Sequence, residues 1–332
     1  DVLTMTNTNF LGNSAKNYGG GIYNSSETFT VVNSTFLGNL ADSSGGGIYS
    51  SGDSSTVTNS TFSGNAAGSS GGGIYVGKGL LTVTNSTLAA NTGGSSGAVY
   101  SAGSLVLRNS ILWGNSGAAI GASQGFVGNW NLIGLDPEFV RDPSDGGDGW
   151  RDNSSTVDVD ESANNDYGDL HLTTQSPAIG YGDESLLTLD GQDLDHDGVT
   201  DEPLPRDRDG NVRVFGETVD CGAFEFQGDV SAGRETPSLV VTTASDTFDL
   251  DDGRISLREA IYYAGMGTFG TTVTFNSALD GATITLGGSV LWLDKPLTID
   301  ASALQSLTVD ADRKSRVFRV TASDVVLDSL TI

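Results

Sequence analysis

The feature of this sequence that most constrains its fold is a run of near-identical segments at a fixed spacing. One block reads Gly-Gly-Gly-Ile-Tyr and begins at Gly19, Gly45 and Gly71, with an eroded copy at Gly97. A second block, related to Asn-Ser-Thr-Phe-Leu-Gly-Asn, begins at Asn7, Asn33, Asn59, Asn85 and Asn109. Successive copies are 26 residues apart, except that the last step of the second block is 24 residues. A constant period of this length is typical of repeat architectures.

Each repeat reads as short strands joined by tight turns. The chain has 46 glycines and only 7 prolines, and Gly and Asn supply the positive φ angles that turns need. A 26-residue repeat with two or three short strands corresponds to one coil of a right-handed parallel β-helix, whose coils stack about 4.8 Å apart. The sequence therefore predicts an all-β fold: a right-handed parallel β-helix with irregular closing coils and one short capping helix.

Stacked coils place equivalent residues on top of one another. We expect an internal column made by the apolar position of each Asn block, namely Phe10, Phe36, Phe62, Leu88 and Leu112. A second internal column would contain Ile22, Ile48, Ile74 and Val99. The last Asn of each block should bond its side-chain amide to the next coil, because an amide both donates and accepts hydrogen bonds. This ladder would contain Asn13, Asn39, Asn65, Asn91 and Asn115.

The repeat also carries a family resemblance. The paired motifs Phe36-Leu37-Gly38-Asn39 and Gly46-Gly47-Ile48 resemble the repeat of the polymorphic outer-membrane proteins and related bacterial surface β-helices. The resemblance covers roughly residues 1–120, and it implies regular β-helix coils over residues 1–134. It says little about a ligand.

Residues 135–226 contain five further motifs in a fixed order. They are Leu135–Val140, Asp166–Leu172, Gln175–Gly180, Asp209–Arg213 and Val219–Glu225. Together they are similar to the choice-of-anchor Q domain, which follows β-helices in exported bacterial proteins. Cys221 and Phe224 stand where that family usually has an aliphatic residue and Tyr. The resemblance implies that this region continues and closes the solenoid, and the lone Cys221 is predicted to be a small core residue.

The last part of the chain has the sequence features of the start of a second β-helix. Residues 227–238 lack apolar periodicity and are predicted to form a linker. The stretch Asp251–Ile261 resembles the CSLREA domain, found at the start of such β-helices, with Ile255 in place of the motif's cysteine. Ser256 and Glu259 predict a capping box for a short amphipathic helix that Gly265 can end, and this helix would cover an open coil. Strands are expected at 272–275, 283–286, 297–299, 307–309, 317–320 and 325–327.

The order of these modules predicts a piece of a longer array. Coils and a closing region come first, and a cap with the first coils of a following unit occupies residues 239–332. We therefore expect the end of one unit to be joined here to the start of the next.

Acidic residues are concentrated in one region of the chain. The net charge is −26, and residues 136–235 contain 26 acidic residues against 6 Lys and Arg. Nucleic acids and anionic membranes bind cationic surfaces, so this composition argues against both and favours divalent cations as partners. No apolar stretch approaches the roughly 20 residues of a membrane span, and no signal peptide is visible. We expect a mature segment that does not insert into a membrane.

The strongest candidate site is an acidic loop. Asp193, Asp195, Asp197 and Asp201 fall at positions 1, 3, 5 and 9 of an EF-hand-like loop, with Gly198 at position 6. Position 12 is Leu204, so the usual bidentate Glu is missing, and Asp207 and Asp209 could complete the shell. The prediction is a Ca²⁺ site, and the alternative is an acidic, solvated loop. A weaker candidate contains Asp142, Asp145 and Asp148.

Catalysis is not predicted. Polysaccharide lyases and hydrolases need paired carboxylates, or a base near Arg or Lys, on one face of the coils. The regular coils contain only four acidic and three basic residues, which are scattered. His171 lies in an alternating Leu-His-Leu strand and is expected to be structural, whereas His196 lies between loop aspartates and is expected to be solvated. The sequence thus predicts a protein that is not an enzyme.

These observations lead to a functional prediction and one principal alternative. The prediction is a non-catalytic, extracellular structural solenoid, a segment of a bacterial surface stalk, fibre or adhesin that Ca²⁺ stabilises and that assembles end to end with other copies. The alternative is a module that binds surface glycans through exposed aromatic residues. The candidates for that role are Tyr23, Tyr49, Tyr75, Trp113, Trp130 and Trp150. A polysaccharide-active enzyme is the third reading.

Overall fold

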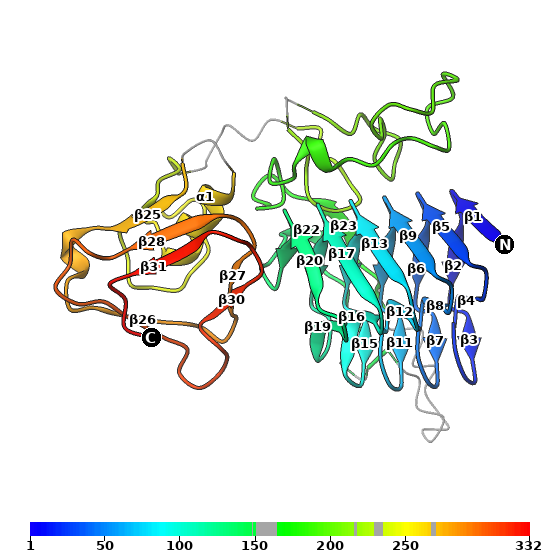
Figure 1. Ribbon diagram of the computed structural model, residues 1–332, viewed down its shortest axis with the longest axis horizontal. Helices are drawn as coiled ribbons and strands as arrows, with labels where there is room; N and C mark the ends of the chain where they lie inside the picture. Colours follow the sequence, from blue (N-terminus) through cyan, green and yellow to red (C-terminus); the bar gives the residue numbers. More distant parts are fainter. Residues whose placement is uncertain (148, 151–164, 216–217, 229–234, 267–269) are drawn as a thin grey trace. The chain divides into compact units, whose positions relative to one another are not determined.

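The chain forms two compact units, which are described separately. The computed structural model describes residues 1–147, 149–150, 165–215, 218–228, 235–266 and 270–332. Unit 1 extends from Asp1 to Gln227, and unit 2 from Gly228 to Ile332 (Figure 1). The finer subdivision into coils, closing region and linker stays a prediction.

Unit 1 contains a stack of coils whose strands form four parallel sheets. Sheet I contains β1 (Val2–Thr6), β5 (Thr28–Val32), β9 (Ser54–Thr58), β13 (Leu80–Thr84), β17 (Ser104–Arg108) and β20 (Phe126–Asn129). Sheet II contains β2 (Asn9–Leu11), β6 (Thr35–Leu37), β10 (Thr61–Ser63), β14 (Thr87–Ala89), β18 (Ile111–Trp113) and β21 (Leu132–Ile133). Sheet III contains β3 (Ser14–Ala15), β7 (Leu40–Ala41), β11 (Ala66–Ala67) and β15 (Thr92–Gly93). Sheet IV contains β4 (Ile22–Asn24), β8 (Ile48–Ser50), β12 (Ile74–Val76), β16 (Ser96–Ser101) and β19 (Ala118–Ala122).

A complete coil therefore has four strands, one more than the sequence predicts at most. The additional strands are those of sheet III, which are only two residues long. Two residues cannot show an alternating pattern, so this sheet is invisible in the sequence. In Figure 1 the coils run in order from the blue N-terminal strands to the cyan and green ones.

The interior of the stack is made of columns of equivalent apolar residues. Phe36 stacks between Phe10 and Phe62, with ring centroids 4.7 and 4.6 Å apart and nearly parallel planes. Leu88 and Leu112 continue this column in register. Burying one such side chain stabilises the folded state by about 1.5–3 kcal/mol, so each coil adds a similar contribution to the stability of the stack. The isoleucines of sheet IV and Val99 form the second column.

Asparagine side chains connect the coils at one corner. Asn39 donates its backbone N–H and its Nδ2 to Oδ1 of Asn65, at 3.0 and 2.9 Å, and its Nδ2 also donates to the Phe10 carbonyl. The same pattern links Asn13 to Asn39, Asn65 to Asn91 and Asn91 to Asn115. The three central amides are fully buried, and their donors and acceptors are satisfied from coil to coil.

A serine ladder connects the coils at the preceding corner. Ser34 Oγ accepts the Thr8 N–H at 3.2 Å and donates to the Val32 carbonyl at 2.9 Å. Its equivalents Ser60, Ser86 and Ser110 accept from the previous coil in the same way. The Asn that precedes each serine adopts a positive φ of 46–53°. This second Asn column and the serine ladder are not part of the sequence prediction.

The described part of residues 135–226 packs along the outer face of sheet II. Asn59 Nδ2 donates to the Arg206 carbonyl, Ser63 Oγ donates to the Tyr167 carbonyl, and Thr87 Oγ1 accepts the Ala223 N–H. Its named strands, β22 (Phe139–Arg141) and β23 (Asp169–Leu172), form an antiparallel pair, and a 3₁₀ turn, η2, covers Glu184–Leu186. The resemblance implies that this region continues the solenoid, whereas these strands do not join the parallel sheets.

Two of the motifs that mark residues 135–226, Asp209–Arg213 and Val219–Glu225, meet in a buried polar cluster. Arg213 is fully buried, and its Nη2 donates to the carbonyls of Asp220 and Gly222 at 2.9 and 2.7 Å. Asp207 is also fully buried and accepts the N–H groups of Asp209, Asn211 and Glu225. Burial and the neighbouring Asp220 raise the pKa of Glu225 to about 9. Cys221 is buried, as the sequence predicts, and its Sγ donates to the Trp130 carbonyl at 3.0 Å.

Unit 2 contains parallel coils with three strands each. One sheet contains β24 (Val240–Val241), β25 (Thr272–Phe275), β28 (Leu297–Asp300) and β31 (Val325–Asp328). The other two pair β26 (Thr283–Thr285) with β29 (Thr308–Asp310), and β27 (Leu291–Leu293) with β30 (Phe318–Val320). A 3₁₀ turn, η3, covers Ser277–Leu279.

The helix α1 (Leu257–Gly265) of unit 2 confirms the predicted capping box. Ser256 Oγ accepts the Glu259 N–H at 3.2 Å, and Glu259 Oε2 accepts the Ser256 N–H at 2.6 Å. The helix packs against β24 and β25. The apolar face expected for an amphipathic helix here contains Leu257, Ala260, Ile261 and Ala264. All of these are buried except Ile261, which is half-buried, and Tyr262 and Tyr263 are buried as well.

Candidate metal centre

The acidic loop of unit 1 is closed at its base by a short antiparallel bridge between Leu189 and Pro203. Asp190 N–H donates to the Glu202 carbonyl at 2.8 Å, and Leu204 N–H donates to the Thr188 carbonyl at 2.8 Å. These bonds place Asp190 and Glu202 opposite each other at the base of the loop. Within the loop, Gly198 adopts a φ of +87°, as the predicted sharp turn requires.

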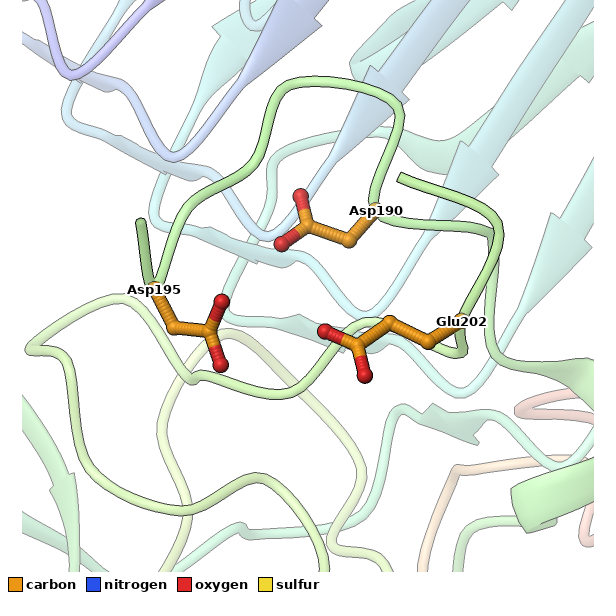
Figure 2. Close-up of side chains that lie close together, drawn as sticks. All are labelled: Asp190, Asp195 and Glu202. Atoms are coloured by element: carbon orange, nitrogen blue, oxygen red, sulfur yellow. The ribbon is translucent and has the colours of Figure 1, made fainter. Parts of the chain in front are cut away.

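Two groups of carboxylates gather in this loop, and Asp195 belongs to both. In one group, oxygens of Asp190, Asp195 and Glu202 lie within 4.8 Å of one another (Figure 2). In the other, oxygens of Asp193, Asp195 and Asp197 do so. The sequence prediction includes Asp193, Asp195 and Asp197, but it does not include Asp190 or Glu202.

The first group has unsatisfied oxygens. Asp190 is only 1% exposed, and its Oδ2 accepts the Leu194 N–H at 2.7 Å. Its Oδ1, together with Asp195 Oδ1 and Glu202 Oε1, is buried without a hydrogen-bond partner. Buried polar atoms are normally paired, because leaving one unpaired costs about 1–3 kcal/mol. The three carboxylates point toward one another in Figure 2, so a shared partner between them would satisfy all three.

The electrostatics of the loop favour a bound cation. Two carboxylates 4 Å apart repel by about 4 kcal/mol at the effective dielectric constant of a protein surface. Burial, followed by the charges of Asp197, Asp195, Asp190 and Asp193, raises the pKa of Glu202 above its ordinary value. A proton on Glu202 or a divalent cation would each relieve this repulsion. Ca²⁺ takes six to eight hard oxygen ligands, and carboxylates, loop carbonyls and water are of that kind.

The remaining acidic candidates lie elsewhere. Asp201 is exposed and belongs to neither carboxylate group of the described residues. Asp207 is held in the buried polar cluster, and Asp209 Oδ2 lies 2.6 Å from His171 Nε2. Asp142 and Asp145 also lie outside both groups, and Asp148 lies outside the described residues.

The structure gives different settings to the two histidines. The ring nitrogens of His171 contact Asp169 and Asp209. Burial lowers the pKa of His171, but the hydrogen bonds to these two carboxylates outweigh burial, and the pKa lies above its ordinary value. His196 is exposed, with a φ of +63°.

The tyrosines proposed as glycan contacts form a continuous stack outside sheet IV. Ring centroids of Tyr23, Tyr49, Tyr75 and Tyr100 are 5.0–5.2 Å apart from one coil to the next, with nearly parallel planes. Each inner ring is therefore covered on both faces by its neighbours, and only edges and hydroxyl groups face outward. A sugar ring packs on an aromatic face, so this geometry fits a structural ladder better than a glycan platform.

The three candidate tryptophans either contact a tyrosine ring or are partly buried. Trp150 is 9% exposed and stacks on Tyr167 at 5.4 Å. Trp130 contacts Tyr181 edge to face, and Trp113 is half-buried.

Comparisons with known proteins agree with the fold. Residues 2–131 match a family described as "Right handed beta helix region". This span contains the coils of unit 1 from β1 to β20, and unit 1 has the stacked parallel strands of a right-handed β-solenoid. Searches of the curated proteins and of the solved structures found no match. Within the described residues, no helix is long and apolar enough to cross a membrane.

Proposed function

We propose that this protein is a non-catalytic structural solenoid of a bacterial cell surface, a segment of an extracellular stalk, fibre or adhesin. The observation that carries the proposal is the unbroken Asn ladder, which links consecutive coils from Asn13 to Asn115. A shaft needs such a repeated, fully bonded core, whereas binding or catalysis needs only a local site. The resemblance of the repeat to bacterial surface β-helices supports the location.

Ca²⁺ is the proposed stabiliser of this scaffold. The proposal rests on the unpaired buried oxygens of Asp190, Asp195 and Glu202 and on the repulsion between them. A cation there would tie the two ends of the loop together, next to the bridge between Leu189 and Pro203. The loop belongs to the segment that packs on sheet II, so its order would contribute to the stability of unit 1.

Calorimetric titration of the metal-free protein with Ca²⁺ tests this role. Glu202→Gln and Asp201→Asn remove one charge from adjacent positions, and only Glu202 belongs to the carboxylate group. We expect Glu202→Gln to weaken Ca²⁺ binding about tenfold or more, and Asp201→Asn to leave it within about twofold. Equal effects of the two variants would show that the loop attracts cations only through its general charge.

We also propose that copies of the chain associate end to end. Consecutive coils pair in the same register, so the edge of one stack offers the hydrogen-bond pattern that another coil would use. Sedimentation velocity over a range of protein concentrations, with Ca²⁺ and with chelator, should show oligomers that grow with concentration. A monomer under all of these conditions would contradict this proposal.

A further inference from the structure

A cavity of about 370 Å³ lies on the outer face of sheet II, apart from the acidic loop. Strands β6 and β10 contribute Thr35, Leu37 and Thr61, and β23 contributes the wall that contains His171. Arg208 and Phe224 come from the segment that packs on the sheet. Ligand pockets commonly have volumes of about 300–1,000 Å³, so this one suits a small ligand or one unit of a polymer.

Arg208 supplies this cavity with a positive charge that makes no direct ion pair with a described carboxylate. Its Nε and Nη2 donate to Thr35 Oγ1 at 3.0 and 2.8 Å, and Nη2 also donates to Asn9 Oδ1 at 3.1 Å. These acceptors are neutral, and Arg208 makes no ion pair with any described carboxylate. By contrast, Arg141 at the same cavity pairs with both oxygens of Asp166. A half-buried guanidinium without a counter-charge is suited to a ligand carboxylate.

The wall formed by β23 offers hydrogen-bond acceptors instead of donors. Asp169 and Asp209 hold the two ring nitrogens of His171 between them, and both contacts are hydrogen bonds only when both nitrogens are protonated. The imidazolium compensates one of the two negative charges. The remaining lone pairs of both carboxylates can accept hydrogen bonds from neutral hydroxyl groups. The cavity also contains apolar surface from Leu37 and Phe224.

We propose that this cavity binds a carboxylated sugar unit, a uronic acid, of an acidic polysaccharide. Its carboxylate would lie at Arg208, its hydroxyl groups would donate to Asp169 and Asp209, and its C–H face would pack on Leu37 and Phe224. A neutral sugar lacks the anion, and a simple carboxylate lacks the hydroxyl groups and the ring. The proposal does not rest on the structural role or on the metal site.

The test compares three probes on the intact protein in the presence of chelator, so that no metal ion can bridge ligand and protein. Galacturonate has the ring and the anion, galactose has only the ring, and acetate has only the anion. We expect galacturonate to bind at least about tenfold more tightly than either of the others in calorimetry or saturation-transfer NMR. Absence of galacturonate binding, or equal binding of galactose or of acetate, would overturn the proposal.

Two variants then locate the site. Arg208→Gln removes the charge, and Leu37→Trp fills the cavity while keeping Arg208. We expect each to weaken galacturonate binding about tenfold or more, whereas Arg254→Gln, at an exposed arginine of unit 2, should bind as the native protein does. Melting curves show whether each variant is folded. Native-like binding by either folded variant would place the ligand elsewhere and contradict the assignment.

Discussion

At the scale of single residues, side-chain amides and hydroxyl groups replace the backbone bonds that corners cannot make. The Asn13–Asn115 ladder is predictable because the amide repeats with the coil and both donates and accepts. The serine ladder is not predictable in this way. Ser34 Oγ accepts the Thr8 N–H of the preceding coil and donates to the Val32 carbonyl of the same coil. That geometry depends on where the previous coil places its backbone, which the sequence does not state.

The central amide of the Asn ladder should be much more important than the first. Asn65 is fully buried, whereas Asn13 is exposed. Asn65→Ala removes the acceptor of the Asn39 N–H and Nδ2 and the donor to the Phe36 carbonyl, so we expect a loss of about 3 kcal/mol or more. The matched variant Asn13→Ala should cost about 1 kcal/mol. Urea unfolding measures both, and equal losses would mean that the ladder is not a main source of stability.

The carboxyl group of Glu235 should make unit 2 more stable in acid. Burial raises the pKa of Glu235 to about 7, only partly opposed by the hydrogen bond from Tyr263. The native state therefore keeps a proton that the unfolded chain releases near its ordinary value of 4.5. This stabilisation is complete below the unfolded pKa and is lost as the pH rises through 7.

Unfolding experiments between pH 4.5 and 7.5 check the assignment of this slope. Glu235→Gln should flatten the decline in stability of unit 2 across that range, and Glu184→Gln, at an exposed position in unit 1, should leave it unchanged. A slope as steep in the Glu235 variant as in the native chain would assign the titration to other groups.

At the scale of elements, the sequence predicts the strands that follow a periodic pattern, but it does not predict which distant segments pack against each other. The six unit 2 strands expected from alternation are present within one or two residues, and β24 and β27 are the two that it misses. The contacts that hold residues 135–226 on sheet II join residues 104–199 positions apart. No local pattern reports such pairings. The acidic loop shows the same limit, since the Leu189–Pro203 bridge brings Asp190 and Glu202 together.

Substitutions at equivalent glycines of one corner can distinguish the cost of backbone strain from the cost of disturbing the segment that packs on that corner. Gly12 and Gly64 share a φ of +62° at equivalent positions. A Cβ at Gly12 would meet nothing within 4 Å, whereas one at Gly64 would lie 2.7 Å from the Trp150 ring and 2.8 Å from Tyr167. Ala90 occupies the equivalent place in a later coil with a φ of +53°, so alanine can adopt this conformation.

We therefore expect Gly64→Ala to be less stable than Gly12→Ala by about 1–3 kcal/mol, the usual effect of overpacking. Urea unfolding of the two variants measures this difference. The same loss of stability in both variants would indicate that the corner conformation alone sets the cost, and that Trp150 does not pack there as described.

At the scale of the molecule, the period of 26 residues is enough to predict the fold class, because stacking in register follows from an exact repeat. The number of strands in a coil is not predictable in this way, since sheet III has strands of two residues. Nor does the repeat predict function. The charged, individual chemistry lies in the segment that packs on sheet II, which contains both the acidic loop and the cavity at Arg208.

The central claim is that a divalent cation stabilises this solenoid, and differential scanning calorimetry of the intact chain tests it most directly. With Ca²⁺ at about 100 times its dissociation constant, the stabilisation would be about 2.7 kcal/mol, which raises the melting temperature of a unit of this size by roughly 5–10 °C relative to chelator. Identical melting curves in Ca²⁺ and in chelator, with no calcium found in the protein by metal analysis, would contradict it.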